Sequence, residues 1–295
     1  MTDGWLLRYE GFEPSEEGLR EALFTLGNGC FATRGAVPEM DADAVHYPGT
    51  YAAGLYNRLR TDIAGHSIES EDLVNLPNWL CLAFCAEDAE WFNPLADGVL
   101  NYSQTLDLRR GLLRRNIRYR DRNNRVTRVE FSRFVHMAKR HIAAIELRIT
   151  AENWSGRMTV RSALDGRVRN AGVARYREFG GTYLKPLETG NVGDDIIYLL
   201  VETAQSSIRI AEAARTRVTH DSTDLNLTRE TSGEQDTIAQ TLSFAIEQAH
   251  PVHIEKIVGL YTSRDPAISE PALAAKTACE RAGSFSELQN GHERA

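Results

Sequence analysis

The carboxylates Glu69, Glu71 and Asp72 are the nearest approach to an acid and base pair in this sequence. A glycosidase that inverts configuration needs one carboxylic acid and one carboxylate on opposite faces of the sugar, with room for a water molecule between them. Residues so close in sequence rarely reach that geometry unaided. We therefore assign no catalytic residue in this chain.

The segment Asn75-Leu-Pro-Asn78-Trp79 has the residue types of a sugar-contacting loop. An indole ring can stack on the apolar face of a sugar while neighbouring amides bond its hydroxyl groups. In the alternative that we favour, the amides cap backbone groups and Trp79 fills a hydrophobic core. Both interpretations fit a loop that faces a further domain, so Asn75, Asn78 and Trp79 are the candidate site residues.

The run Gly27-Asn28-Gly29, followed by Gly35, contains the glycines of a phosphate-binding loop. In a dinucleotide fingerprint the third glycine comes three residues after the second and opens a helix. Here Gly35 comes too late, and Cys30-Phe-Ala-Thr has the pattern of a strand. The run instead predicts a turn in which asparagine or glycine adopts a positive φ angle.

Metal-ligating residue types are present but scattered. Cys81 and Cys85 on one strand would lie ~13 Å apart, too far for a single zinc ion. The other groups lack the three or four ligands at regular spacing that a metal site shows; they are His250 with His253, His136 with His141, and Asp41 with Asp43 and His46. We expect no metal and no organic cofactor.

Alternation of apolar and polar residues predicts that strands position these side chains. Period-two alternation indicates half-buried strands, and it recurs in residues 100–108, 145–150, 158–164, 238–246 and 252–260. Turn signals separate the runs; they are Arg110-Gly111, Asp121 to Asn124, Asn153 to Gly156, and Asp165-Gly166. Many antiparallel strands with polar turns predict an all-β fold, a large antiparallel sandwich of two sheets.

Helical patterns are confined to the two ends of the chain. Residues 14–22 begin with Pro14 and acidic residues, as a helix start does. A second helix is expected from an N-cap at Ser269 to Gly283, and residues 285–295 begin a third. The glycine-rich segment 180–195 lacks periodicity and predicts a long loop.

Composition limits the partners and the compartment. The chain has 295 residues, a net charge of −7 and a pI near 5.7, which argues against nucleic acid as a partner. The arginine-rich run 109–125 alternates with apolar residues, so we interpret it as the solvated face of a β-hairpin. No apolar window is long enough to cross a bilayer, and four scattered cysteines with no secretory signal predict free thiols in the cytoplasm.

Three turn-rich blocks within residues 24–80 carry a family resemblance. They read F-T-L-G-N-G-C-F-A-T-R-G, Y-P-G-T-Y-A-A-G-L-Y-N-R and E-D-L-V-N-L-P-N-W-L, and further blocks follow at residues 106–115, 150–157 and 162–176. In this order and spacing they resemble the N-terminal domain of glycoside hydrolase family 65, of the kojibiose, maltose and trehalose phosphorylase type. The resemblance covers more than half of the chain.

The resemblance implies a fold, and it implies that catalysis takes place in a separate domain. It implies a galactose-mutarotase-like super-sandwich over residues 1–268 and, at 269–295, the start of a helical linker to an α/α barrel. In that family the barrel holds the glutamate acid, and in the phosphorylases inorganic phosphate attacks the anomeric carbon as co-substrate. Asn75, Asn78 and Trp79 would then be barrel-facing, and the 295 residues alone would be inactive.

Three functions remain open at this point. The first is a non-catalytic domain of an inverting α-glucoside phosphorylase or hydrolase acting on a glucose disaccharide. The second is a free-standing carbohydrate-binding or aldose-epimerase-like module, although the scattered histidines do not form an epimerase site. The third is a scaffold that orients the barrel and forms a homodimer. The expected partners are the protein's own barrel, the disaccharide and a second copy of the chain, with no nucleic acid and no membrane.

Overall fold

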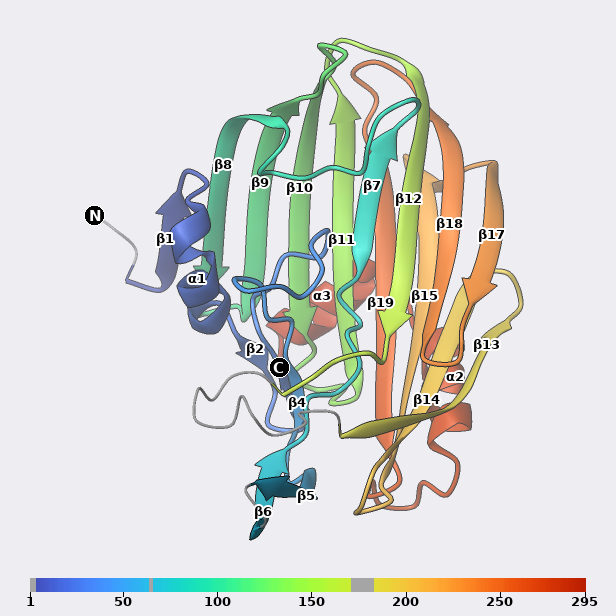
Figure 1. The fold of residues 1–295 in the computed structure, drawn as a ribbon. Helices are drawn as coiled ribbons and strands as arrows, with labels where there is room; N and C mark the ends of the chain where they lie inside the picture. The colour runs from blue at the N-terminus through green and yellow to red at the C-terminus, as the bar shows by residue number, and fades with distance from the viewer. Residues whose placement is uncertain (1–3, 64–65, 171–182) are drawn as a thin grey trace.

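The predicted strands form one large antiparallel sheet that spans the molecule (Figure 1). The computed structural model describes residues 4–63, 66–170 and 183–295. In spatial order the sheet contains β1 (Leu6–Glu10), β8 (Gly98–Asp107), β9 (Leu112–Arg120), β10 (Val126–Val135), β11 (Ile142–Ala151), β19 (Val252–Thr262), β15 (Arg209–His220), β14 (Ile196–Thr203) and β13 (Leu184–Val192), and β16 (Thr223–Asp224) pairs with β15.

A second sheet covers one half of the large sheet. It consists of β17 (Leu227–Gly233), β18 (Thr237–Ile246), β12 (Gly156–Asp165) and β7 (Leu82–Ala86), all antiparallel. The hydroxyl of Thr216 on β15 donates to that of Ser162 on β12, 2.8 Å away, and both are buried. Together with the apolar core between the sheets, this confirms the predicted all-β sandwich.

The N-terminal segment covers the other half of the large sheet. It contains a 3-10 turn η1 (Pro14–Glu16), helix α1 (Glu17–Leu23), and the small sheet β2 (Leu26–Gly27), β3 (Phe31–Thr33) and β4 (Thr50–Ala52). Arg133 on β10 is fully buried and donates to the carbonyl oxygens of Arg34 (3.0 Å) and Ala36 (3.1 Å). The segment therefore covers the lower part of the inner face of β8 to β10 in Figure 1, and Phe92 of the β7–β8 connection packs on Tyr119 of β9, with ring centroids 4.5 Å apart.

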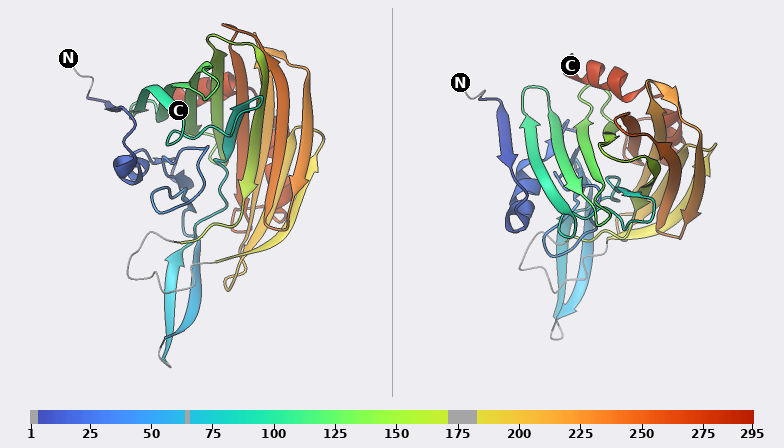
Figure 2. Two further views of the ribbon diagram at one scale, coloured as in Figure 1. Left: turned by 45° about the horizontal axis from the view of Figure 1, so that its top comes forward. Right: turned by 90° about the horizontal axis from the view of Figure 1, so that it is seen from above.

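Two C-terminal helices lie on the outer face of the large sheet, opposite α1 (Figure 2). Because side chains alternate along a strand, Arg133 points inward while Phe134 points outward and packs on α3 (Phe285–Glu293). Helix α2 (Pro271–Arg281) packs on β14 and β15. Its N-cap is Glu270 rather than the expected Ser269, because proline favours the first helical position and fixes the start there.

The start of the chain and the glycine-rich segment differ from expectation. The predicted helix at 14–22 divides into η1 and α1, and α1 continues to Leu23. Residues 184–192 form strand β13 rather than a loop, while 180–182 lie outside the described residues. As an edge strand β13 pairs only with β14 and keeps polar side chains. A Cβ on Gly190 would meet the Tyr198 ring at 2.7 to 2.9 Å, so close packing requires that glycine.

One hairpin projects beyond the sandwich. It is formed by β5 (Tyr56–Ile63) and β6 (His66–Leu73), and it lies at the lower end in Figure 1. Within the described residues, no helix is long and apolar enough to cross a membrane.

Candidate functional site

Asn75 holds two loops together by backbone hydrogen bonds. Its Oδ1 accepts from the backbone N–H of Thr50 at 3.0 Å, and its Nδ2 donates to the carbonyl oxygen of Arg169 at 3.1 Å. The N–H of Leu76 donates to the carbonyl of Thr50 at 2.8 Å. The segment 47–56, which contains β4, and the loop 75–79 therefore lie side by side, while Asn75 itself is only 3% exposed.

Asn78 and Trp79 are also buried. The Oδ1 of Asn78 accepts from the N–H of Leu80 at 3.0 Å, and its Nδ2 donates to the Sγ of Cys81 at 3.1 Å. Trp79 belongs to the main core and is fully buried. The three candidate residues therefore lie together as in the structural interpretation of this loop. Trp79 fills the core, and the side-chain amides of Asn75 and Asn78 form hydrogen bonds with backbone groups. A sugar could stack on Trp79 only if the ring became uncovered, and a barrel-facing role for this loop stays a prediction.

The two loops and the C-terminal helices share one end of the sandwich but not one face. Arg264, just before α2, donates to the carbonyl oxygen of Gly54. The helices themselves pack on the outer face of the large sheet, whereas residues 47–56 include β4 of the small sheet, on the inner side (Figure 2). Any domain that contacts both surfaces has to extend around that end.

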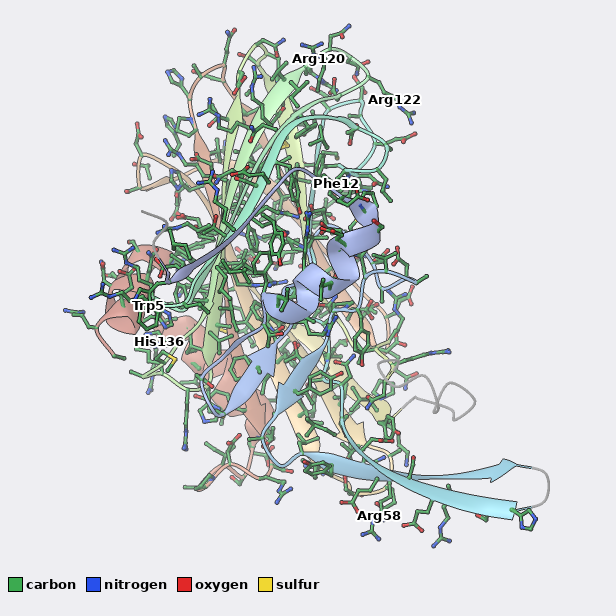
Figure 3. All side chains as sticks on the ribbon, turned by 90° about the vertical axis from the view of Figure 1, so that its left-hand side faces the viewer. Trp5, Phe12, Arg58, Arg120, Arg122 and His136 are labelled. Carbon is green, nitrogen blue, oxygen red and sulfur yellow. The ribbon has the colours of Figure 1, made fainter. Side chains whose placement is uncertain are left out.

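The acidic cluster of the sequence forms ion pairs along the projecting hairpin. Arg58 pairs with Glu71 at 2.8 Å and with Glu69 at 3.3 Å, and these side chains are roughly half exposed. Figure 3 shows Arg58 on this hairpin, away from the body of the sandwich. Asp72 accepts from the hydroxyl of Tyr183. These contacts place the cluster on the surface of the hairpin.

Two histidines paired by the sequence occupy different environments. His136 is buried against His292 of α3, with ring centroids 5.8 Å apart (Figure 3 shows His136 beside the C-terminal helices). His141 instead stacks on Tyr261, with ring centroids 4.1 Å apart. Burial first, and then the neighbouring His292 and Lys139, lowers the pKa of His136 to about 4. His136 therefore packs against α3 as a neutral side chain.

A buried amine and carboxyl lie in the sandwich core. Lys256 on β19 donates to the carbonyl oxygens of Ala163 (2.7 Å) and Cys81 (2.9 Å). Burial lowers the pKa of Lys256 to about 8 and raises the pKa of Glu212. Perturbed groups of this kind often mark active sites. These two are fully buried, however, and neither lines the nearby cavity of about 240 Å³ that Cys81 and Ala163 border. The hydrogen bond of Lys256 to Ala163 joins β19 to β12, whereas the carboxyl oxygens of Glu212 have no hydrogen-bond partner among the described residues.

Comparison with known proteins gives one consistent family. The model of "Glycosyl hydrolase family 65, N-terminal domain" matches residues 7–295. An uncharacterized glycosyl hydrolase of Mycobacterium tuberculosis is 39% identical over 99% of this chain and 22% of its own length. A kojibiose phosphorylase of Caldanaerobacter subterraneus is 30% identical over 88% of this chain and 33% of its own length. A trehalose 6-phosphate phosphorylase of Lactococcus lactis is 27% identical over 90% of this chain and 33% of its own length.

A solved structure supports the fold. The protein described as "Putative kojibiose phosphorylase from human microbiome" superposes with a TM-score of 0.84 at 20% identity, over 100% of this chain and 38% of that one. The chain therefore spans between about a fifth and two fifths of the length of these relatives. With the family match over nearly its whole length, this chain belongs to glycosyl hydrolase family 65, as the N-terminal domain of that family.

Proposed function

We propose that this chain is the non-catalytic N-terminal domain of an inverting α-glucoside phosphorylase or hydrolase that acts on a glucose disaccharide. The observation that carries the proposal is the match to the N-terminal domain over residues 7–295, combined with relatives of which this chain spans only 22% to 33%. In this proposal residues 1–268 form the sandwich domain, and 269–295 begin a linker to a catalytic α/α barrel.

The filled inner face of the large sheet supports a structural rather than a catalytic role. A sugar-converting sandwich needs an open face with an acid and a base reachable by the substrate. Here Arg115 on β9 forms a buried ion pair with Glu39 at 2.6 Å, beneath the N-terminal segment. Arg133 is fully buried in the same region. The charged groups of this face are thus used to hold the covering segment in place.

The proposed partners follow from this role. They are the protein's own barrel, the disaccharide bound by the barrel, and a second copy of the chain in a homodimer. Inorganic phosphate is a co-substrate if the whole protein is a phosphorylase, and the reaction we propose needs no organic cofactor. The four cysteines are free, which agrees with a cytoplasmic protein, since disulfides form in oxidising compartments.

The alternative is a free-standing carbohydrate-binding or epimerase-like module. It requires an accessible sugar-stacking ring in the candidate loop, and burial of Trp79 argues against it. Two experiments distinguish the proposals. The reading frame beyond codon 295 is sequenced, and the longer protein is assayed with phosphate and kojibiose, trehalose, maltose or nigerose. We expect a barrel-coding segment and phosphorolysis or hydrolysis of one of these sugars. A reading frame without a barrel, together with sugar binding by the 295 residues, would favour the free-standing module.

A further inference from the structure

Asn28 ties two distant turns together at one end of the sandwich. Its Nδ2 donates to the carbonyl oxygens of His136 and Arg140, both at 2.9 Å, in the connection between β10 and β11. Its Oδ1 accepts from the N–H of Cys30 at 2.9 Å. Gly29 has φ +84°, so the turn after Asn28 adopts the left-handed conformation that glycine favours. This arrangement fixes Cys30 at the turn that carries His141.

The ring of His141 is held with one nitrogen free to bind. Its Nδ1 lies 2.9 Å from the carbonyl oxygen of Leu260, and a carbonyl can only accept, so Nδ1 carries a proton. Stacking on Tyr261 fixes the plane of the ring. In neutral His141, Nε2 then presents a lone pair, and it lies 3.8 Å from the Oδ1 of Asp265. A histidine that donates its other N–H to a backbone carbonyl is typical of a metal ligand.

Asp265 is oriented in the same way. Its Oδ2 accepts from the N–H of Thr262 at 2.7 Å and from the hydroxyl of Thr262 at 3.2 Å. Oδ1 is the carboxylate oxygen that faces Nε2 of His141. Two electron-pair donors that face each other repel unless a cation or a proton lies between them. The carboxylate is thus held in place by its own turn, with one oxygen directed at His141.

Cys30 completes a three-donor cluster. The Sγ of Cys30, a ring nitrogen of His141 and a carboxylate oxygen of Asp265 all lie within 4.8 Å of one another, and each side chain is half-buried. The cluster borders a cavity of about 510 Å³, which gives an ion and a water molecule access. We propose that Cys30, His141 and Asp265 bind one zinc ion, with a fourth position open to water.

Zinc fits this donor set better than other common dications. Sulfur, imidazole nitrogen and a single carboxylate oxygen are the ligands that zinc takes, whereas magnesium and calcium prefer oxygen alone. Tetrahedral zinc with bonds of about 2.0 to 2.3 Å holds its ligand atoms about 3.3 to 3.7 Å apart. Side-chain movements of about 1 Å would therefore bring these three atoms onto one ion.

The positive charges of two arginines disfavour a cation at this site. Arg140 and Arg264 line the same cavity, and Arg264 is engaged with the carbonyl of Gly54. A thiolate and a carboxylate cancel the two charges of zinc, so the occupied site is neutral, and its formation releases the proton of the Cys30 thiol. The ordinary competitor is an ion pair between protonated His141 and Asp265, without metal.

The site is independent of the proposed enzymatic role. Its ligands come from the turn between β2 and β3, the turn between β10 and β11, and the segment between β19 and α2. Zinc would join these three segments and stabilise the end of the sandwich from which α2 leaves. The sequence did not reveal the set because the three residues lie far apart in it and share no spacing motif.

The first test uses the 295-residue chain, with any affinity tag removed and bound metal stripped by a chelator. We expect it to bind one zinc ion per chain with a Kd of about 1 µM or tighter, and zinc to raise its melting temperature. Cobalt(II) should give the spectrum of a tetrahedral site with a thiolate charge-transfer band. Absence of that band, or a zinc Kd weaker than about 1 µM, would overturn the site.

Variants assign the ligands. Cys30→Ser, His141→Gln and Asp265→Asn should each weaken zinc binding at least about 100-fold. These residues would contact the ion directly, and loss of a residue that only hydrogen-bonds to a ligand already costs up to about 100-fold in affinity. The matched controls are Cys85→Ser, another half-buried cysteine, and His253→Gln, whose ring lies 3.4 Å from Glu146 in a similar pair. The controls should bind as the original chain does. Equal binding by folded Cys30→Ser and His141→Gln would refute the assignment, and if a ligand variant fails to fold, the cobalt spectrum decides.

Discussion

The guanidinium of Arg215 on β15 donates to the carbonyl oxygen of Cys279 at the end of α2, 2.8 Å away. The same group donates to the carbonyl oxygens of Ala282 and Gly283, each at 2.7 Å. Carbonyls at a helix C-terminus have no partner within the helix, so one buried cation satisfies the end of α2 and the turn into α3. The segment that we propose leads to the barrel is thereby fixed on the outer face of the large sheet.

Replacing this cation should loosen the C-terminal helices. We expect Arg215→Met to lower the free energy of unfolding by about 3 kcal/mol or more, because several buried carbonyls lose charged hydrogen-bond donors. Urea denaturation followed by circular dichroism measures the change. The matched control is Arg217→Met, which removes a half-exposed ion pair with Asp195 and should cost less than about 0.5 kcal/mol. Similar small losses for both variants would contradict the role of Arg215.

Acid should weaken the packing of α3 through His136. Its Nδ1 accepts from the N–H groups of Ala138 (3.1 Å) and Lys139 (3.0 Å), and its Nε2 has no hydrogen-bond partner among the described residues. Because burial lowers the pKa of His136 to about 4, the unfolded chain binds a proton that the folded chain does not. Stability from this group is therefore present above the unfolded pKa of about 6.5 and is lost as the pH falls towards about 4.

The measurement is the free energy of unfolding at two pH values. The decrease between about pH 7.5 and about pH 5 should be about 2 kcal/mol larger for the original chain than for His136→Asn, which cannot titrate in this range. His46 works in the opposite direction, since its hydrogen bond to Glu21 raises its pKa, and it is common to both proteins. An equal pH dependence of the two proteins would show that His136 does not contribute.

Asn75 should behave as a structural residue. Asn75→Ala leaves the buried N–H of Thr50 without its acceptor, which we expect to cost about 1 to 3 kcal/mol of unfolding free energy. The control is Asn101→Ala, an exposed strand residue, with an expected effect within about 0.5 kcal/mol. Thermal and urea unfolding measure both. A stable Asn75→Ala chain would leave the structural explanation of this loop without support.

The thiols should be free and unequal in reactivity. Burial first raises the pKa of Cys279 to about 12, so its reactive thiolate is scarce at neutral pH. After chelator treatment, a thiol reagent should count four thiols in the unfolded chain and leave Cys279 unmodified in the folded one. Cys279→Ala should lower the thiol count of the unfolded chain by one and leave the thiol count of the folded chain unchanged. Fewer than four thiols in freshly purified protein would indicate a disulfide and contradict the proposed compartment.

The sequence predicted those strands of the fold whose two faces differ in polarity. The alternation around Leu147 and Leu242 reports one face on the core, and β11 and β18 confirm it. Strand β13 was missed because an edge strand with exposed polar residues has no such alternation. Ser269 was misplaced as the N-cap since the proline that follows determines the helix start more strongly.

Contacts between distant residues were beyond the sequence. In the arginine-rich run, most side chains are solvated as predicted, but Arg115 lies in phase with the inward residues Leu113 and Ile117 and pairs with Glu39. Only the register of β9 and the path of the N-terminal segment bring that acid to it. The cluster of Cys30 and His141 likewise depends on how Asn28 joins two turns.

The most direct test of the account is the activity of the 295 residues themselves. The purified chain, incubated with phosphate and each of kojibiose, trehalose, maltose and nigerose, should release neither glucose 1-phosphate nor glucose, because we propose that the acid of the reaction lies in the barrel. The longer protein that includes the proposed barrel serves as the positive control. Turnover by the 295-residue chain that is abolished when one of its own carboxylates is replaced would contradict the account.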